Sequence, residues 1–265
     1  MKKILNILVI VMVSIIIGLL VFVNYKVTNT PCKSLSVVID YNNSDALITN
    51  NDIESQIISA CDSLVGRPMK TIDLTLINKS LVDNPVIKKA NIHTSFGGEI
   101  TVQLSQRRPI LRVCNKEGDS YYVSEDGVLL NVRPLFPVRV PVANGDIFTT
   151  YYDKLKMEIS PKNDQDTLVN SMIIYQLYKM GLYIDKDEWL KLFIDQIYVS
   201  NKDFILIPRI GNFSIVFGTT EKMAEKFNKL KTFIEKGIPK VGWDKYKTIN
   251  LAYDNQIVCT KINQN

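Results

Sequence analysis

Residues 84–109, NPVIKKANIHTSFGGEITVQLSQRRP, decide the fold of the first globular part of this chain. Apolar and polar side chains alternate in VIKKANIHTS and again in ITVQLSQRRP, and Phe96–Gly97–Gly98–Glu99 separates the two runs. Alternation with a period of two is typical of strands that bury one face, and a pair of glycines suits a tight turn between them. The segment therefore predicts a β-hairpin.

Three further elements precede this hairpin. Residues 35–41 alternate as a strand. Asn50–Asn51–Asp52 and Asp73 are suitable first residues for two helices, and Asn84–Pro85 ends the second helix. Each helix has an apolar stripe at helical spacing: Ile53, Ile57 and Ala60 in the first, and Leu74, Ile77 and Leu81 in the second. The order β-α-α-β-β over residues 35–109 predicts a small module in which two helices cover one face of a three-stranded sheet.

The rest of the chain, residues 110–265, predicts a mixed, strand-rich β domain, so the fold class is α+β. Proline-rich sequence with Pro134, Pro137 and Pro141 interrupts it. Strands are predicted over 110–115, 121–130 with a turn at Glu125–Asp126–Gly127, 196–200, 204–208, 213–217, 248–253 and 256–262. Helices are predicted over 167–182 and 220–236, the second with the stripe Met223, Phe227, Leu230 and Ile234 and with Gly237 and Pro239 at its end.

The N-terminus predicts a membrane anchor. Residues 4–23 carry no charged side chain, and a helix of that length reaches about 30 Å, the thickness of the hydrocarbon core of a bilayer. Lys2 and Lys3 place the short start, residues 1–3, in the cytoplasm, and residues 24–34 form a linker outside it. A cleaved signal peptide is the alternative, but the apolar run exceeds the usual length of its core and no A-x-A-like site follows.

The composition does not favour an enzyme. The chain has 265 residues, a net charge of +5 that is dispersed, and a single histidine, His93, which we interpret as a surface residue. No motif of a serine hydrolase, zinc protease or nucleotide-binding loop occurs, and no C-x-x-C pair predicts a zinc site. We therefore expect no catalytic residue, cofactor or metal. Outside the cytoplasm Cys32 and Cys61 could form a disulfide, with buried free thiols as the alternative.

Five motifs resemble those of the bacterial cell-division protein family FtsQ, also called DivIB. They are NPVIKKANI (Asn84–Ile92), QRRP (Gln106–Pro109), YYVSEDGVLL (Tyr121–Leu130), VPVANG (Val140–Gly145) and INLAYDNQIV (Ile249–Val258). Their order behind a single anchor is also that of the family. Val86, Gln106 and Ala252 depart from the family's more usual Trp, Glu and Arg. The resemblance implies that residues 35–109 form a POTRA domain and that the remainder is the β domain of the family.

The resemblance also implies a function. Proteins of this family are division scaffolds without enzymatic activity, which bind partners of the FtsB and FtsL type and help to recruit or regulate septal peptidoglycan synthesis. They lie in the cytoplasmic membrane at the septum, with most of the chain outside the cytoplasm. We expect the last hairpin to provide a sheet edge near residues 248–253, extended by the strand to residue 262, because such an edge can accept a partner strand. The expected contact residues are Ile249, Leu251, Tyr253, Ile257 and Val258.

Two basic residues, Arg107 and Arg108, are a possible secondary contact for an acidic partner or for lipid headgroups. The alternative is a solvated face of a strand. Two other functions are alternatives. A membrane-tethered cell-wall hydrolase needs a convergent catalytic set, which one isolated histidine does not supply. An outer-membrane assembly factor with a POTRA module needs a C-terminal β-barrel and no N-terminal anchor, and the sequence predicts the reverse of both.

Overall fold

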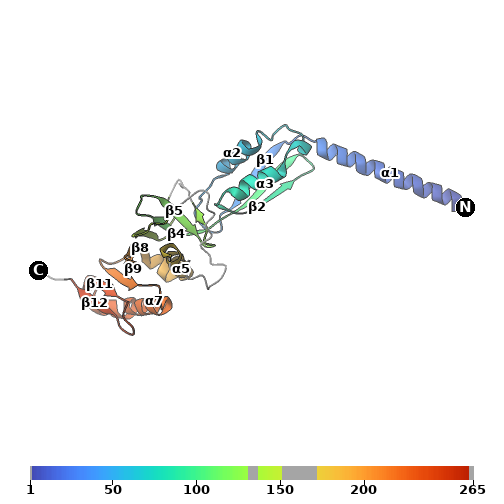
Figure 1. The fold of residues 1–265 in the computed structure, drawn as a ribbon. Coiled ribbons are helices and arrows are strands. Elements are labelled where there is room, and N and C mark those ends of the chain that lie inside the picture. Colours follow the sequence, from blue (N-terminus) through green and yellow to red (C-terminus); the bar gives the residue numbers. More distant parts are fainter. Residues whose placement is uncertain (1, 131–136, 151–171, 263–265) are drawn as a thin grey trace. The chain divides into compact units, whose positions relative to one another are not determined.

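The computed structural model describes residues 2–130, 137–150 and 172–262 (Figure 1). The chain divides into two compact units. The first consists of Met1–Asn42 with Ile48–Gln106, and the second of Asn43–Leu47 with Arg107–Asn265. Gln106 is the last residue of the first unit and Arg107 continues the second, and each unit is described by itself below.

The first unit contains the predicted β-α-α-β-β module. Its elements are the N-terminal helix α1 (Lys2–Asn29), then β1 (Ser34–Asp40), α2 (Asn50–Cys61), the short 3-10 helix η1 (Met69–Thr71), α3 (Leu74–Asp83), β2 (Ile87–Thr94) and β3 (Glu99–Gln106). The three strands form one sheet in the order β1-β3-β2. β2 and β3 pair antiparallel as the predicted hairpin, and β1 joins β3 in parallel because two helices separate it from the hairpin.

The core of this module lies between its two helices and the sheet. Ile100, Val102 and Leu104 of β3 are buried, as the alternation predicted, while the side chains between them are more exposed. The helices supply Ile53, Ile57, Ile77 and Leu81, each of which has no exposed surface. Ala60 and Leu74, which the helical spacing placed on the same stripes, lie at the margin and are half-buried.

The first residue of α2 differs from the prediction. Thr49, one position before the predicted Asn50–Asn51–Asp52, is the N-cap, and its hydroxyl accepts a hydrogen bond from the N–H of Asp52. The carboxylate of Asp52 in turn accepts the N–H of Thr49 at 2.8 Å, which completes a capping box. The second prediction is confirmed, because Asp73 caps α3 by accepting the N–H groups of Thr75 and Leu76.

We expect Thr49→Ala to destabilise α2 by about 1 kcal/mol, because it leaves N–H groups of the first turn without an acceptor. Amide hydrogen exchange of residues 50–61 in the full chain measures the effect. Thr49→Ser keeps the hydroxyl and is the matched control, which should exchange as the wild type does. Equal exchange of the alanine and serine variants would contradict the role of the cap.

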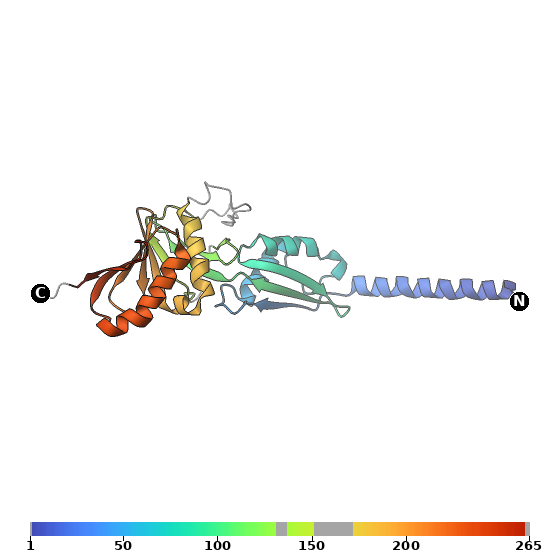
Figure 2. The same cartoon turned by 90° about the horizontal axis from the view of Figure 1, so that it is seen from below.

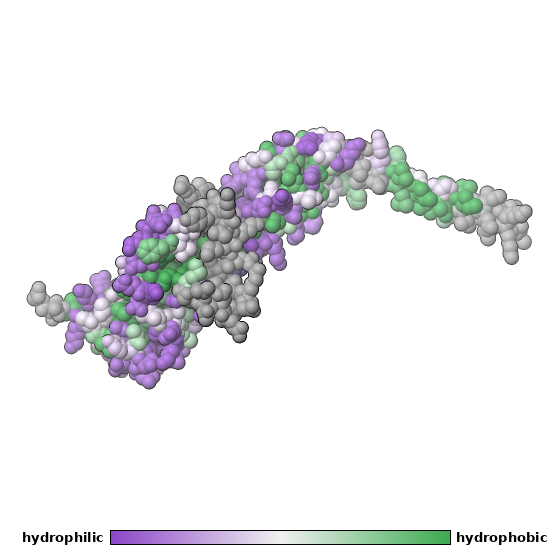
Figure 3. Space-filling model, in the orientation of Figure 1, coloured by the Kyte–Doolittle hydropathy of each residue, from purple (hydrophilic) through white to green (hydrophobic). Residues whose placement is uncertain are grey.

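The N-terminal helix is longer than predicted. α1 continues to Asn29 through part of the segment 24–34 that was predicted to be a linker. The described side chains from Ile10 to Val23 form a continuous apolar surface (Figure 3), with exposed residues throughout. Among the residues whose side chains are described, no helix reaches the combination of length and apolarity that a membrane span requires.

The second unit is built on one large sheet. Its strands and helices are β4 (Pro109–Cys114), β5 (Ser120–Ser124), β6 (Leu129–Leu130), β7 (Val142–Gly145), α5 (Ile173–Lys186), α6 (Glu188–Phe193), β8 (Ile194–Ser200), β9 (Asp203–Pro208), β10 (Ser214–Gly218), α7 (Met223–Thr232), the π-helical turn η2 (Phe233–Gly237), α8 (Ile238–Val241), β11 (Tyr246–Asn250) and β12 (Val258–Lys261). The described strands follow the order β12-β11-β10-β9-β8-β7-β4-β5-β6. β7 pairs in parallel with β4 and β8, and β10 pairs in parallel with β11.

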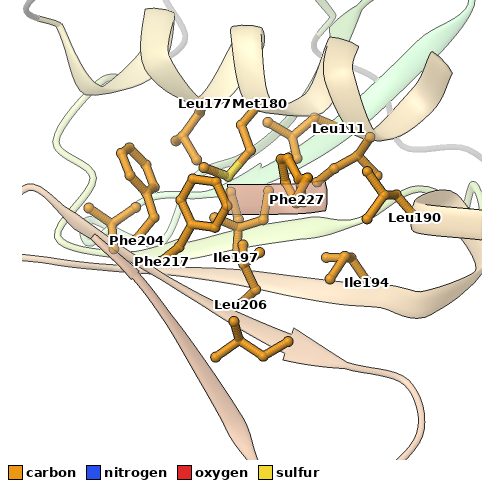
Figure 4. Packing of buried hydrophobic residues seen from close by; sticks show 14 of the residues in the cluster. Leu111, Leu177, Met180, Leu190, Ile194, Ile197, Phe204, Leu206, Phe217 and Phe227 are labelled. Atoms are coloured by element: carbon orange, nitrogen blue, oxygen red, sulfur yellow. The ribbon is translucent and has the colours of Figure 1, made fainter. Parts of the chain in front are cut away.

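Helices α5 and α7 cover one face of this sheet (Figure 2). Figure 4 shows how the aromatic rings of Phe204, Phe217 and Phe227 meet Leu177 and Met180 between the helices and the strands. All five are buried, and the rings of Phe217 and Phe227 lie 4.8 Å apart. The apolar stripe predicted for the helix at 220–236 therefore forms part of the core, through Phe227, Leu230 and Ile234.

Two predicted helices have different limits in the structure. Residues 167–171 of the first lie outside the described part of the chain, and from Ile173 the helix continues to Lys186. The second begins at Met223 and does not end at Gly237, because a π turn and α8 extend it to Val241. Pro239 lies in the first turn of α8, where an N–H group has no partner within the helix, so the proline is tolerated there. Helix α6 was not predicted.

Candidate functional site

The terminal hairpin, β11 with β12, lies at one end of the large sheet (Figure 1), and β6 is the last described strand at the other end. The predicted edge near residues 248–253 is corrected, because β11 is paired on both sides, with β10 in parallel and β12 antiparallel. Among the described strands β12 has one neighbour only, so its outer side is the edge. The strand that follows the predicted edge is therefore the one available for pairing.

The structure separates the five predicted contact residues into three groups by their exposure. Ile249 and Leu251 have no exposed surface and belong to the core, so their side chains cannot contact a partner. Tyr253 is 50% exposed and Val258 is 43% exposed. Ile257 is half-buried and packs against the core. Only the residues of the turn and of β12 can therefore offer side chains at the edge.

The pairing of β11 and β12 determines which backbone N–H and C=O groups of β12 point to the outer side of the sheet. Leu251 donates its N–H to Val216 of β10, so by the alternation of a strand Thr248 and Asn250 face β12. These two residues oppose Thr260 and Val258, which therefore direct their backbone groups toward β11. The N–H and C=O groups of Cys259 and Lys261 then point to the outer side. A partner strand would pair with these two residues.

Two lysines, one within α7 and one at its N-cap, hold the turn that leads into β12. The ammonium group of Lys229 donates hydrogen bonds to the carbonyls of Leu251 and Tyr253, at 3.2 and 2.7 Å. Lys222 forms an ion pair with Asp254 at 2.9 Å, which raises the pKa of the lysine and lowers that of the carboxyl group. The turn is thus fixed from the helix side.

A third lysine on the same face of α7 is buried. Lys226 donates to the carbonyl of Thr219 at 2.8 Å and lies 5.1 Å from the ring centre of Phe217. Burial lowers its pKa, and the nearby charge of Lys229 lowers it further. The sequence interpretation missed this set, although the spacing of Lys222, Lys226 and Lys229 on one helical face was a usable signal.

The two arginines predicted as a secondary contact are engaged within the second unit. Arg108 makes a two-pronged interaction with Asp185 of α5, at 2.7 and 2.6 Å, and also donates to Glu125 at 3.1 Å. Arg107 donates to Asp126 at 2.9 Å. Glu125 and Asp126 belong to the predicted β-turn after β5, so this turn has a structural role in holding the arginines.

The Arg108–Asp185 pair changes the pKa of both groups. Burial alone raises the pKa of Asp185, but the hydrogen bonds and charges of Arg108 and Lys191 outweigh it, and the pKa is lowered overall. Hydrogen bonding to Asp185 raises the pKa of Arg108. Because the folded-state pKa of Asp185 is lowered, its contribution to stability is complete above the unfolded value of about 4 and is lost as the pH falls through the folded value.

We expect Asp185→Asn to lower the melting temperature at pH 7, because it removes the carboxylate that pairs with Arg108. The difference in melting temperature from the wild type should narrow as the pH falls below the unfolded value of about 4 and then through the lowered pKa of folded Asp185, because the wild-type carboxyl group is then protonated as well. Thermal melts of the full chain across this range measure it. Asp195→Asn is the control, since the Asp195–Arg209 pair is exposed at 45% and 51%. A difference in melting temperature between Asp185→Asn and the wild type that does not depend on pH would contradict the ionic role of Asp185.

The remaining predicted groups lie apart from the edge. His93 is exposed on β2 of the first unit. The four cysteines are free thiols, including Cys32 and Cys61, and burial raises the pKa of Cys32, Cys61 and Cys259. In the described residues no three His, Cys, Asp or Glu side chains gather as a metal site would require.

Comparison with known protein families gives two matches. A family described as FtsQ/DivIB, C-terminal related, matches residues 108–260. A POTRA-like domain matches residues 30–105. The boundary between the matches coincides with the boundary between the two structural units. No protein in the curated collection that was compared matches the chain.

Proposed function

Because this chain belongs to the FtsQ/DivIB C-terminal related family, which indicates a role in cell division, we propose that it is a non-enzymatic scaffold of the division machinery. The observation that supports this most directly is the free edge of β12. A scaffold needs surfaces for other proteins, and an edge strand with unpaired backbone groups is such a surface.

The proposed partners are division proteins of the FtsB and FtsL type. One of them would add a strand to β12, pairing with the outward backbone groups of Cys259 and Lys261. Tyr253 and Val258, both exposed beside this edge, would supply apolar contacts. Through these partners the protein would help to recruit or regulate the septal peptidoglycan synthase.

The proposed location is the cytoplasmic membrane at the division septum. The support for an anchor is the sequence, in which residues 4–23 are uncharged and follow Lys2 and Lys3. In this arrangement residues 1–3 lie in the cytoplasm, and both folded units lie outside it. N-terminal sequencing of the membrane-bound protein tests the anchor, and a mature start between residues 24 and 31 would show cleavage instead.

The scaffold function is tested by affinity capture of the tagged full chain from dividing cells, with mass spectrometry, together with imaging of a fluorescent fusion. We expect small coiled-coil division proteins to be enriched and the fusion to gather at the septum. The same capture with residues 255–265 deleted, after circular dichroism has shown that the remainder is folded, assigns the contact. Full capture and septal localisation of the folded truncation would place the docking site elsewhere.

A further inference from the structure

In the second unit a groove of about 790 Å³ lies beside the turn that leads into the edge strand β12. The helical segment from α7 to α8 forms one wall, and the turn before β12 forms the other. Phe233 and Ile257 supply apolar lining, Lys236 and Lys240 stand on the helical wall, and Asn255 and Gln256 stand on the opposite wall. Ile257 lines the groove and directly precedes β12, so the groove lies next to the start of the edge strand.

The groove carries an excess of positive charge. Three lysines and one glutamate, Glu225, line it. The ammonium group of Lys229 is already engaged by the carbonyls of the turn. Lys236 and Lys240 are exposed, and within the described part of the chain neither takes part in an ion pair. Two cationic groups therefore remain available in a groove that offers amide groups on its other side.

The shape of the groove depends on an irregular part of the helix. η2 is a π-helical turn, in which Ile238 donates its N–H to the carbonyl of Phe233. The ring of Phe233 lies over Gly237, where an added Cβ would come within 2.8 Å of the ring. The same ring packs 6.0 Å from that of Tyr246 on β11. A glycine at position 237 is thus needed for the ring to take its place in the groove, and π turns are frequent at functional sites.

We propose that this groove binds an acidic segment of the same partner protein whose neighbouring strand pairs with β12. The inference rests on the proposed function, because it requires a partner at the edge. Carboxylates would meet Lys236 and Lys240, while backbone or amide groups of the segment would meet Asn255 and Gln256. Charge complementarity of this kind gives specificity and register, which a backbone ladder alone does not provide.

Site-specific photo-crosslinking in the full chain, in dividing cells, tests the proposal. Benzoylphenylalanine is placed at Val258 on the edge in one variant and at Thr232 in the groove in another, which leaves both lysines in place. We expect both positions to label the same protein, and the peptide labelled from position 232 to be rich in Asp and Glu. Labelling from 258 alone, or a labelled peptide without acidic residues, overturns the groove proposal and leaves the edge function standing. Absence of labelling at both positions overturns both.

A double charge-reversal variant then measures how much the two groove lysines contribute electrostatically to partner binding. Lys236→Glu with Lys240→Glu should reduce the crosslinking yield from position 258 about tenfold, because two attractive pairs become repulsive. The matched control is Lys70→Glu with Lys79→Glu, which changes the net charge equally at two exposed lysines of the first unit. Equal yields from the two double variants would overturn the proposal. Circular dichroism of both variants confirms that they are folded.

Discussion

Replacing Lys261 by proline should weaken binding of the proposed division partner by about tenfold or more while the second unit stays folded. The backbone N–H of Lys261 points to the outer side of β12, so proline removes a donor that a partner strand would use and leaves the ladder to β11 in place. The loss of one hydrogen bond costs about 0.5–1.5 kcal/mol, and the proline ring also obstructs the approaching strand. Co-purification from dividing cells, or titration with the purified partner, measures the effect.

Two matched variants distinguish the effect of the lost backbone N–H on binding from an effect of the lysine side chain and from an effect on folding. Lys261→Ala removes the exposed side chain but keeps the N–H group, so binding should be retained. Thr260→Pro removes a donor that faces β11 and should loosen the hairpin itself, which circular dichroism detects. If Lys261→Ala weakens binding as much as Lys261→Pro, the contact is made by the side chain and strand addition at β12 is wrong.

Leu81→Ala should destabilise the first unit by roughly 2–5 kcal/mol. Leu81 has no exposed surface and lies in the core formed by α2, α3 and the sheet, so its truncation removes buried apolar area and leaves a cavity. In a module with so small a core, this loss is a large fraction of the total stability. Denaturant unfolding of the full chain, followed by hydrogen exchange of residues 74–106 to assign the transition, measures it.

The same helix provides the control for this prediction. Leu76 carries an identical side chain but is 43% exposed, so Leu76→Ala deletes the same atoms where little packing depends on them. We expect the denaturation midpoint of the Leu76→Ala variant to stay close to that of the wild type. Similar midpoints for the two alanine variants would mean that Leu81 is not a core residue of a cooperatively folded module.

The sequence predicted the first unit well because its signals are local. The alternation in β3, the helical stripes of α2 and α3, and the cap Asp73 each depend on neighbours in the chain, and the structure confirms them. Thr49 was missed because four consecutive residues, Thr49 to Asp52, can all serve as caps. Gly237 and Pro239 indicate the end of a helix in the sequence, but a π turn places the proline in the first turn of α8, where its missing N–H donor is not needed.

The candidate site was predicted less accurately because it depends on strand order. The residue pattern of 248–262 indicated a hairpin, yet it could not indicate that β11 also pairs with β10. In the structure Ile249 and Leu251 are buried, and β12 rather than β11 is the terminal strand of the sheet. Arg107 and Arg108 were also predicted as possible contacts, but their carboxylate partners include Asp185, which is distant in sequence.

The parallel pairing of β10 with β11 affects the order in which the protein can fold. The two strands are neighbours in the sheet, but α7, η2 and α8 lie between them in the chain, so this contact closes a long loop. Until that loop closes, β10 is the margin of the sheet and exposes its own unpaired backbone, which can pair wrongly with other chains. The edge of β12 therefore belongs to the large sheet only once this loop has closed, so a partner that adds a strand to β12 would select molecules in which β10 and β11 are already paired.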